Sequence, residues 1–496
     1  MTSAAQVDRD ADAPPRQRAR RRRRSLVVAS ILVLVFAAGA VIEFAHLSAG
    51  NIAGDEVTYA TAGWQYLHGT FTANLEHPLT GKYLIGVAEL AVGHLSVTVS
   101  RLVTATMSFA AAVVIWLWMR REFGSLLAIV PAGFALLLPV FDPDGNPYDR
   151  IERMAMLDPI MAAFLVAASA TIWQWHRTER WVWLVLSGVA FGLAITSKAP
   201  ALAILPAFAV VIWTPRWRSY RAAVPALVWG AVAVVTGWLS YLPAGPVRAI
   251  TYMLKFQSSA NATGHATVIA GKTYLHAPWW GVLWFGAHGL GALATIVVLA
   301  GIAAALVVPG HQLLSWFLFA ATLCSVGFFA LIAHDALPYY YEDIAWSAIP
   351  LAGIGVVKLY QLRRRHWRGV AVGLATVLLA LAAVTVVVQL REVVTLRPYG
   401  IARVEPVLQS AGVTGSDRVL IVQASPSTDS PYLGNNLETD PAAGPFRAIV
   451  IQQDHRFPMP PQVRAYLAAH PELKAVKLDD TTVYVLPKPT QLVVGR

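Results

Sequence analysis

The sequence predicts an all-α protein that crosses a membrane about eleven times and ends in a small α/β domain. Of its 496 residues, 56% are hydrophobic and only 14% are charged, and the mean hydropathy is +0.53. The hydrophobic residues form long runs, which is typical of helices that span a bilayer. The formal net charge of +11 is confined to short clusters between these runs. Basic clusters between apolar runs orient a protein in a membrane, so the positive charge does not indicate a nucleic-acid partner.

The N-terminal part combines a basic tail with a first membrane helix. Residues 20–24 are all arginine, and the apolar run 25–44 follows directly. This run is longer than the roughly 7–15 residues of a signal-peptide core. We therefore expect residues 1–24 to be a disordered cytoplasmic tail and 25–44 to be the first span. The composition, rich in Ala, Val and Arg, is typical of a bacterial protein, for which the plasma (inner) membrane is the expected location.

The remaining spans depend on how residues 82–118 are divided. They form either two helices, 82–97 and 102–118, or a lead-in along the membrane surface, 82–93, followed by one tilted helix. The second division places the basic segments 120–122, 176–180, 216–221 and 361–368 together on the cytoplasmic side, as the positive-inside rule requires. The predicted spans are then 25–44, 94–118, 126–140, 159–175, 181–196, 199–213, 222–242, 282–308, 313–333, 344–359 and 370–388.

The C-terminal part, 391–496, has a different pattern from the membrane domain, 25–390. Short β-type segments are expected at 418–423, 446–453, 473–478 and 481–487, and a helix at 460–471. The turn-rich tract 425–436 is expected to be a loop. With eleven spans, this α/β domain is extracytoplasmic, on the same side as the outer loops 47–93 and 243–281. The single cysteine, Cys324, permits no intrachain disulfide.

Charged and polar residues gather at the predicted outer edge of the membrane, where they oppose the usual charge bias and indicate function. A carboxylate there can take the proton of an attacking hydroxyl, and fixed cations can hold a phosphate as it leaves. This combination suits group transfer from a lipid-linked phosphate. The residues are Asp55, Glu56, His77, Lys82, Arg153, Asp158, Lys198, His265, His334, Tyr339 and Tyr340, together with Arg101 inside a span.

Five segments resemble protein O-mannosyltransferases and their relatives in glycosyltransferase family 39, within the GT-C superfamily of membrane glycosyltransferases. Asp-Glu after the first span, followed by His-Pro and Gly-Lys, is similar to the first outer loop of that family. The other four segments, in the family's order, are RMAMLD (153–158), ITSKAP (195–200), GHATVIAGKTYLHAPWW (264–280) and HDALPYYYEDIAWSAIP (334–350).

The resemblance implies transfer of a sugar, usually mannose, from a polyprenyl-phosphate donor to a hydroxyl acceptor, with inversion at the anomeric carbon. By position, Asp55 matches the catalytic base and Glu56 its neighbour. Phosphate binding is expected of Lys82, Arg153, Lys198 and Arg101, and substrate binding of His77, Asp158, His265, His334, Tyr339 and Tyr340. The acceptor is a protein, a glycan or a glycolipid. No metal site and no cofactor besides the lipid-linked donor is predicted.

Several structural interpretations remain open beside the functional ones. Asp55 and Glu56 also suit the first turn of a helix, Lys82 suits an anchor at the membrane surface, and Arg153 with Asp158 suits an ion pair. Tyr339 and Tyr340 also suit an aromatic belt. Three alternative functions also remain: aminoarabinose-transferase-like modification of a glycolipid, transport of lipid-linked sugars, and a non-catalytic role in handling them.

Overall fold

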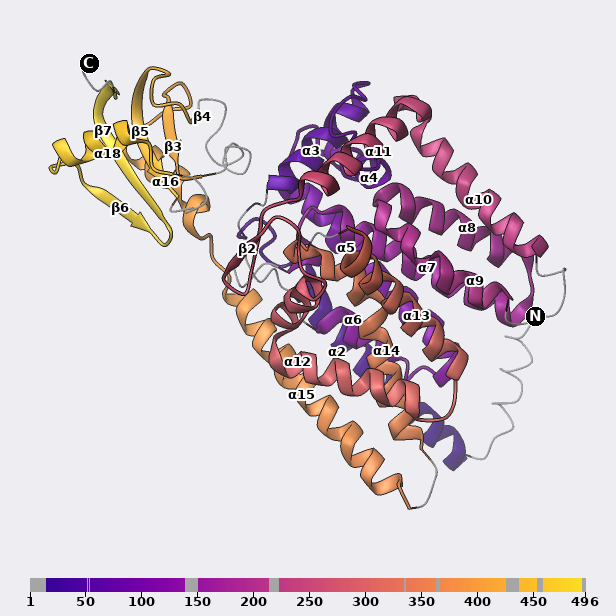
Figure 1. The fold of residues 1–496 in the computed structure, drawn as a ribbon. Helices are drawn as coiled ribbons and strands as arrows, with labels where there is room; N and C mark the ends of the chain where they lie inside the picture. The colour runs from indigo at the N-terminus through magenta and orange to yellow at the C-terminus, as the bar shows by residue number, and fades with distance from the viewer. Residues whose placement is uncertain are drawn as a thin grey trace.

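The protein is a bundle of helices with a small sheet domain at its C-terminal end, as the sequence predicts (Figure 1). The computed structural model describes residues 15–50, 52, 54–138, 150–213, 223–333, 336–362, 366–424, 437–452 and 458–492. The predicted basic loop 216–221, the predicted loop 425–436 and His334 lie outside the described residues.

Eight helices in the described part of the chain are long and apolar enough to cross a membrane. Two shorter apolar helical segments follow α7: α8 (Trp181–Ser197), and η2 (Ala199–Ile204) continued by α9 (Leu205–Trp213). The helix expected at 126–140 is only α6 (Ile129–Leu137), so the predicted number of eleven spans is not confirmed. Each of these eight candidate spans is formed mainly by one helix, and the first comprises residues 25–44 of α2. The helices are α2 (Pro15–Phe44), α5 (Val97–Phe123), α7 (Leu157–Thr178), α10 (Ala223–Tyr241), α12 (Gly281–Val307), α13 (Gln312–Phe328), α14 (Glu342–Gln361) and α15 (Arg368–Thr395).

Helix α14 is the central element of the bundle. Almost all of its residues are buried, and it packs against α6, α7, α12, α13 and α15. Its closest approach is to α12, where a Cβ on Gly355 would lie only 1.8 Å from the carbonyl oxygen of Gly301. Because glycine has no side chain, the two backbones can touch at this crossing. The contact fixes the position of α14 along α12, and with it the position of the acidic first turn of α14.

The segments expected to be loops at one end of the bundle are largely helical. Residues 47–93 contain α3 (Gly54–Leu67) and α4 (Thr80–Val92), and the segment after α10 contains α11 (Pro246–Thr263) and a hairpin of β1 (Thr267–Ile269) and β2 (Lys272–Tyr274). Helices α3 and α4 cross at Gly63 and Gly86, where a Cβ on Gly86 would lie 2.2 Å from the Gly63 carbonyl oxygen. This contact brings the start of α4 against α3.

The C-terminal part forms a five-stranded sheet with strand order β4-β3-β5-β7-β6. Strands β3 (Val419–Val422), β4 (Leu437–Glu438) and β5 (Pro445–Ile451) are parallel, whereas β7 (Thr481–Gln491) runs antiparallel to β5 and to β6 (Ala475–Leu478). Two apolar clusters lie against the sheet, one including α16 (Val404–Ser410) and the other α18 (Pro461–Ala469). This α/β fold confirms the predicted class.

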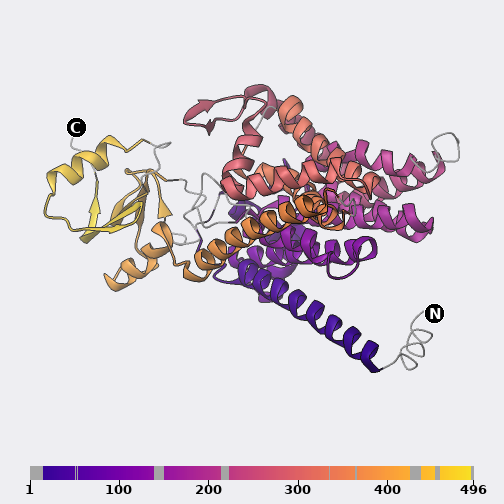
Figure 2. The ribbon, with the colours of Figure 1, turned by 90° about the horizontal axis from the view of Figure 1, so that it is seen from below.

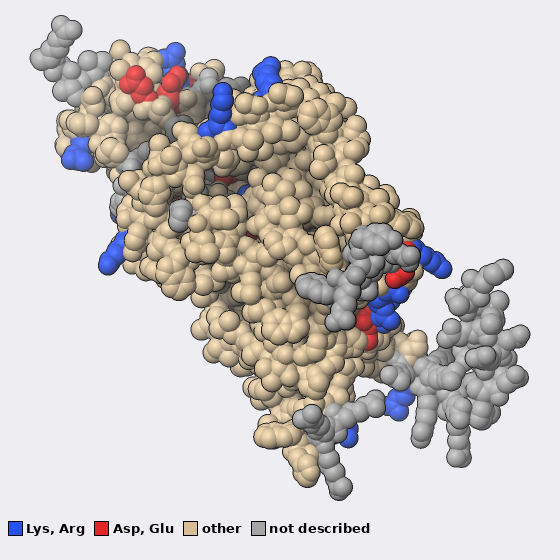
Figure 3. All heavy atoms as spheres, turned by 45° about the vertical axis from the view of Figure 1, so that its right-hand side comes forward, with Lys and Arg blue, Asp and Glu red and all other residues tan. Residues whose placement is uncertain are grey.

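The sheet domain lies beyond the end of α15, at the same end of the bundle as α3 and α4 (Figures 1 and 2). Helices α2 and α15 pack together along one side of the bundle, so the first and last long helices are neighbours (Figure 2). On the face shown in Figure 3, charged side chains gather toward the two ends and leave a wide uncharged band between them. Such a band is what a bilayer requires, and the chain is a multi-pass membrane protein.

Candidate active site

Five of the polar residues predicted for the site converge from segments far apart in the chain. The Tyr339 hydroxyl, in the short helix η7 (Pro338–Tyr341), donates a hydrogen bond of 2.7 Å to Oδ2 of Asp55 on α3. Lys198 Nζ forms an ion pair with Oδ1 of Asp158, in the first turn of α7. The same ammonium lies 4.2 Å from the ring centre of Tyr340 and 5.3 Å from that of Tyr339. Carboxylates, a cation and two phenols therefore form one cluster.

Local backbone rules place the two members of the ion pair. Lys198 follows α8 in an extended conformation (φ −154°, ψ 134°), because Pro200 cannot continue the helix and disfavours helical geometry in the residue before it. Asp158 lies at the N-terminal end of α7, where the helix dipole favours an acid and where Pro159 is tolerated because its missing N–H would lack a partner anyway. The two ends meet where α7 and α8 pack together.

The adjacent acids Asp55 and Glu56 have different environments. Glu56 is fully buried and accepts two hydrogen bonds of 2.7 Å from the Arg101 guanidinium, one from Nε and one from Nη2. The backbone N–H of Ala155 donates a third, also at 2.7 Å. Asp55 is only half-buried, and Tyr339 donates to it. Glu56 therefore joins α3 to α5 and to the segment before α7, whereas Asp55 faces the polar cluster.

Lys82 holds the loop between α3 and α4. Its side chain is completely buried, and Nζ donates to the carbonyl oxygen and to Oδ1 of Asn74 and to the carbonyl oxygen of His77, the last two at 2.9 Å. Burial lowers the pKa of Lys82 to about 7, against the opposing effect of Glu76. The ammonium is therefore directed at the backbone of this loop, which places His77.

His77 is a neutral imidazole in this site. Burial, reinforced by the nearby charges of Lys82 and Lys198, lowers the pKa of His77 to about 3. The ring lies edge-on to Tyr59, with 5.7 Å between ring centres. A neutral ring of this kind can donate one hydrogen bond and accept another, which suits contact with a sugar hydroxyl.

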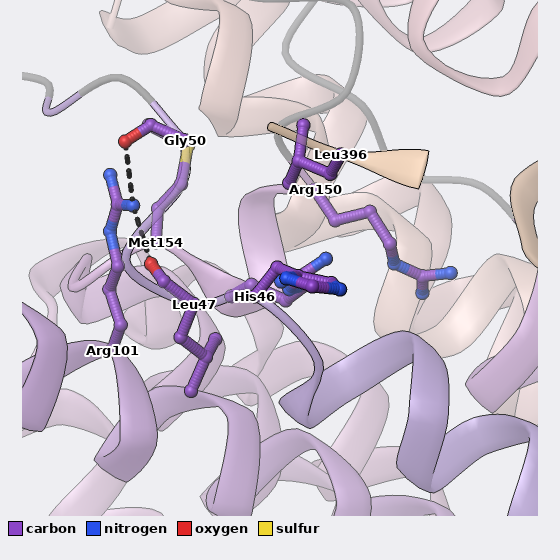
Figure 4. A pocket seen from close by; sticks show the side chains of 8 residues that line it. His46, Leu47, Gly50, Arg101, Arg150, Met154 and Leu396 are labelled. Atoms are coloured by element: carbon purple, nitrogen blue, oxygen red, sulfur yellow. Dashed lines mark hydrogen bonds between the residues drawn. The ribbon is translucent and has the colours of Figure 1, made fainter. Parts of the chain in front are cut away.

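Arg101 and Arg153, both predicted to bind phosphate, line a separate small pocket together with Arg150 (Figure 4). Arg101 donates to the carbonyl oxygens of Leu47 and Gly50, at 2.9 and 3.1 Å, in addition to its pair with Glu56. Arg153 donates to the carbonyl oxygen of Ala45. Both guanidinium groups therefore hold the turn that follows α2.

Arg150 belongs to a buried network that the sequence did not reveal. It contacts Oε1 of Glu152 at 2.5 Å and Oε1 of Glu43 at 3.7 Å, and it donates to Oε1 of Gln389 on α15 at 2.7 Å. Glu43 and Glu342 could have been noticed as acids in the last and first turns of apolar helices, where charge is rare. Gln389 gives no such signal. This network connects α2 and α15 to the segment that leads into Asp158.

Besides the residues already placed outside the cluster, two further predicted residues are not placed in it. His265 is exposed in the segment before β1, and His334 lies outside the described residues. No group of three or more His, Cys, Asp or Glu side chains suited to hold a metal ion occurs among the described residues.

Solved structures with this architecture are membrane glycosyltransferases. ArnT from Cupriavidus metallidurans matches in its apo state with a TM-score of 0.58 at 16% identity, over 93% of this chain and 97% of that chain. The same protein bound to undecaprenyl phosphate matches with a TM-score of 0.56 at 16% identity, over 94% and 98%. The oligosaccharyltransferase AglB from Archaeoglobus fulgidus, in complex with an inhibitory peptide and a dolichol-phosphate, matches with 0.53 at 11% identity, over 87% and 70%. The fold is that of the GT-C superfamily.

The sequence itself points to the same superfamily. Residues 33–245 match the family model described as dolichyl-phosphate-mannose-protein mannosyltransferase. Among curated proteins, none matches the sequence. The fold and this partial sequence match therefore both relate the chain to membrane glycosyltransferases of the GT-C type, in agreement with the resemblance found in its motifs.

Proposed function

We propose that the protein transfers a glycosyl group, mannose in the simplest case, from a polyprenyl-phosphate-linked donor to a hydroxyl acceptor. The observation that carries this proposal is the half-buried carboxylate of Asp55, held by Tyr339 beside the Lys198–Asp158 ion pair. A general base and a cation close together at one end of apolar helices are what such a transfer needs. The lipid chain of the donor lies along those helices.

In the proposed reaction, Asp55 accepts the proton of the acceptor hydroxyl as its oxygen attacks the anomeric carbon. The new carbon–oxygen bond forms on the face opposite the phosphate, so the configuration inverts. The bond from the anomeric carbon to the phosphate oxygen breaks, and the electron pair leaves with the polyprenyl phosphate. Lys198 stabilises the charge that develops on this phosphate.

Positioning roles follow for the neighbouring residues. The Tyr339 hydroxyl orients the Asp55 carboxylate, and the Glu56–Arg101 pair fixes the start of α3, on which Asp55 lies. Lys82 fixes the loop that carries His77, and His77 binds a hydroxyl of donor or acceptor. His265 and His334 are proposed to contact substrate when the site is occupied.

The donor class is supported by the ligands of the structural relatives. Undecaprenyl phosphate is bound in one ArnT structure and a dolichol-phosphate in one AglB structure. Both are long lipids with a terminal phosphate, and the apolar helices here offer the same kind of environment to such a chain. We also propose that the N-terminus is cytoplasmic and that the site and the sheet domain lie outside a bacterial inner membrane.

The test is transfer of radiolabel from polyprenyl-phosphate-linked mannose by the purified protein, with cell-envelope extract as the acceptor pool. Wild type should transfer label, and Asp55→Asn should not. The control is Asp440→Asn, at an exposed acid in the sheet domain. Fractionation of the labelled product identifies the acceptor as protein, glycan or glycolipid. Full transfer by Asp55→Asn would remove Asp55 from the role of base, and no binding of any polyprenyl-phosphate sugar would overturn the proposed donor.

A further inference from the structure

Asp343 is a buried acid that lies against the candidate site, and the proposed reaction does not use it. It is the second residue of α14, and its exposed fraction is only 2%. Its carboxyl group lies within hydrogen-bonding reach of the carboxyl group of Asp158, on the neighbouring helix α7. Asp158 also forms the ion pair with Lys198. Asp158 therefore has two side-chain partners, a cation and a second carboxyl group.

The packing of α14 holds Asp343 in this position. The hydroxyl of Ser325 on α13 donates a hydrogen bond of 2.7 Å to the backbone carbonyl oxygen of Asp343. The close contact between Gly301 and Gly355 fixes the same helix along α12. Buried backbone contacts on two sides therefore present the Asp343 side chain to α7.

The hydrogen-bond partners of the two acids indicate which of them carries a proton. Lys198 donates to Oδ1 of Asp158. Neither carboxyl oxygen of Asp343 receives a hydrogen bond from a donor among the described residues. An ionised Asp343 would thus be a buried charge without a donor, beside the like charge of Asp158. A protonated Asp343 avoids both costs, because its O–H group has an acceptor in the Asp158 carboxylate.

The other charged groups nearby offer Asp343 no alternative partner. From neighbouring elements, Asp158 on α7 and Lys198 after α8 act on it, and the acid Glu342 precedes it on α14. Arg150 acts on Glu342, but this guanidinium is already in an ion pair with Glu152. The base that acts on Asp343 is therefore the one that Asp158 already holds.

We propose that Asp343 is a positioning residue that remains protonated, donates a hydrogen bond to Asp158 and holds that carboxylate against Lys198. This inference rests on the proposed transfer, because it concerns the same cation. With Asp343 protonated, the Lys198 ammonium faces a single negative charge, and the pair is neutral when the donor phosphate arrives. With Asp343 ionised, two carboxylates would outweigh one ammonium, and the site would repel that phosphate.

The experiment compares two neutral replacements of similar size in the full chain, in nanodiscs. Asp343→Asn keeps an N–H donor for Asp158, so its transfer of labelled mannose should stay within about threefold of wild type. Asp343→Leu offers no donor, and its transfer should fall roughly 10- to 100-fold, since a hydrogen bond to a charged group is lost. Transfer is normalised to the amount of folded protein, measured by thermal unfolding.

Infrared spectroscopy adds a measurement that needs neither donor nor acceptor. A protonated carboxyl group has a carbonyl stretching band that a carboxylate lacks. Wild type at neutral pH should show a band of this kind that disappears in Asp343→Asn. The control, Asp440→Asn, replaces an exposed acid in the sheet domain and should leave the band in place.

The two measurements separate failure of this inference from failure of the proposed transfer. An infrared spectrum unchanged by Asp343→Asn would overturn the protonated state. Equal transfer by the Asn and Leu variants, in an active wild type, would overturn the positioning role. A wild type that transfers no mannose but loses the band in Asp343→Asn would refute the proposed donor and support the protonated pair.

Discussion

Asp55 and Glu56 are adjacent in the sequence, and we expect their neutral replacements to fail in opposite ways. Glu56 pairs with Arg101 at 2.7 Å, and the two side chains are 0% and 5% exposed. Glu56→Gln leaves a buried guanidinium without its counter-charge, which costs about 3–5 kcal/mol of stability. Asp55→Asn keeps an oxygen that can accept the Tyr339 hydrogen bond. Its stability should change by less than about 1 kcal/mol, whereas transfer should fall roughly 10²- to 10⁴-fold because a general base is lost.

The assay combines thermal unfolding of each variant in nanodiscs with transfer of labelled mannose, normalised to the amount of folded protein. A third variant, Glu56→Gln with Arg101→Met, serves as the control. It removes both charges, so it should be more stable than Glu56→Gln alone. A Glu56→Gln protein as stable as wild type would refute the structural role of the ion pair. An Asp55→Asn protein that unfolds as early as Glu56→Gln would show that both acids stabilise the fold.

Three other predictions concern the first loop and its helices. Lys82→Met removes the donors to the carbonyl oxygens of Asn74 and His77, so limited proteolysis should cut residues 68–79 faster than in wild type; an unchanged rate would contradict this role. Burial lowers the pKa of His77 from 6.5 to about 3, so the unfolded chain binds a proton that the folded chain excludes, and stability falls as pH drops from about 6.5 toward 3. When thermal unfolding is measured against pH, the His77→Gln variant should lose this dependence of stability on pH. A variant with the same slope as wild type would contradict the neutral state assigned to His77. Gly86→Val places a Cβ 2.2 Å from the Gly63 carbonyl oxygen, so the yield of monodisperse protein should collapse. Gly230→Val is the matched control and should be far milder, because Gly230 is helical and a Cβ there meets no atom within 4 Å.

The sequence predicts the long membrane helices and the class of the C-terminal domain because hydrophobic runs and short alternating strands are local signals. The helices α3, α4 and α11 were expected to be loop or a surface lead-in. They lie outside the long apolar runs, and tertiary contacts such as the Gly63–Gly86 crossing stabilise them. The count of eleven spans is not confirmed, and it is least supported at α6, where the described part of the apolar run 126–140 contains a helix of nine residues.

For the site, motif resemblance indicates candidate residues but not how they pair. Asp55, Asp158, Lys198 and Tyr339 were expected near one another because they follow the order of a known family. The pairing of Glu56 with Arg101, 45 residues apart, depends on how α3 packs on α5, which no spacing reveals. Arg101 gave a partial signal, because a charge inside an apolar run requires a partner.

The hydrogen bond between Tyr339 and Asp55 joins residues separated by 284 positions. A membrane protein enters the bilayer from its N-terminus during translation, so Asp55 is inserted long before Tyr339 has been synthesised. The nascent chain therefore carries Asp55 without the hydroxyl that binds it. For the proposed transfer, this means that the site is complete only when η7 has been made, and that a prematurely terminated product lacks the hydrogen bond proposed to orient the base.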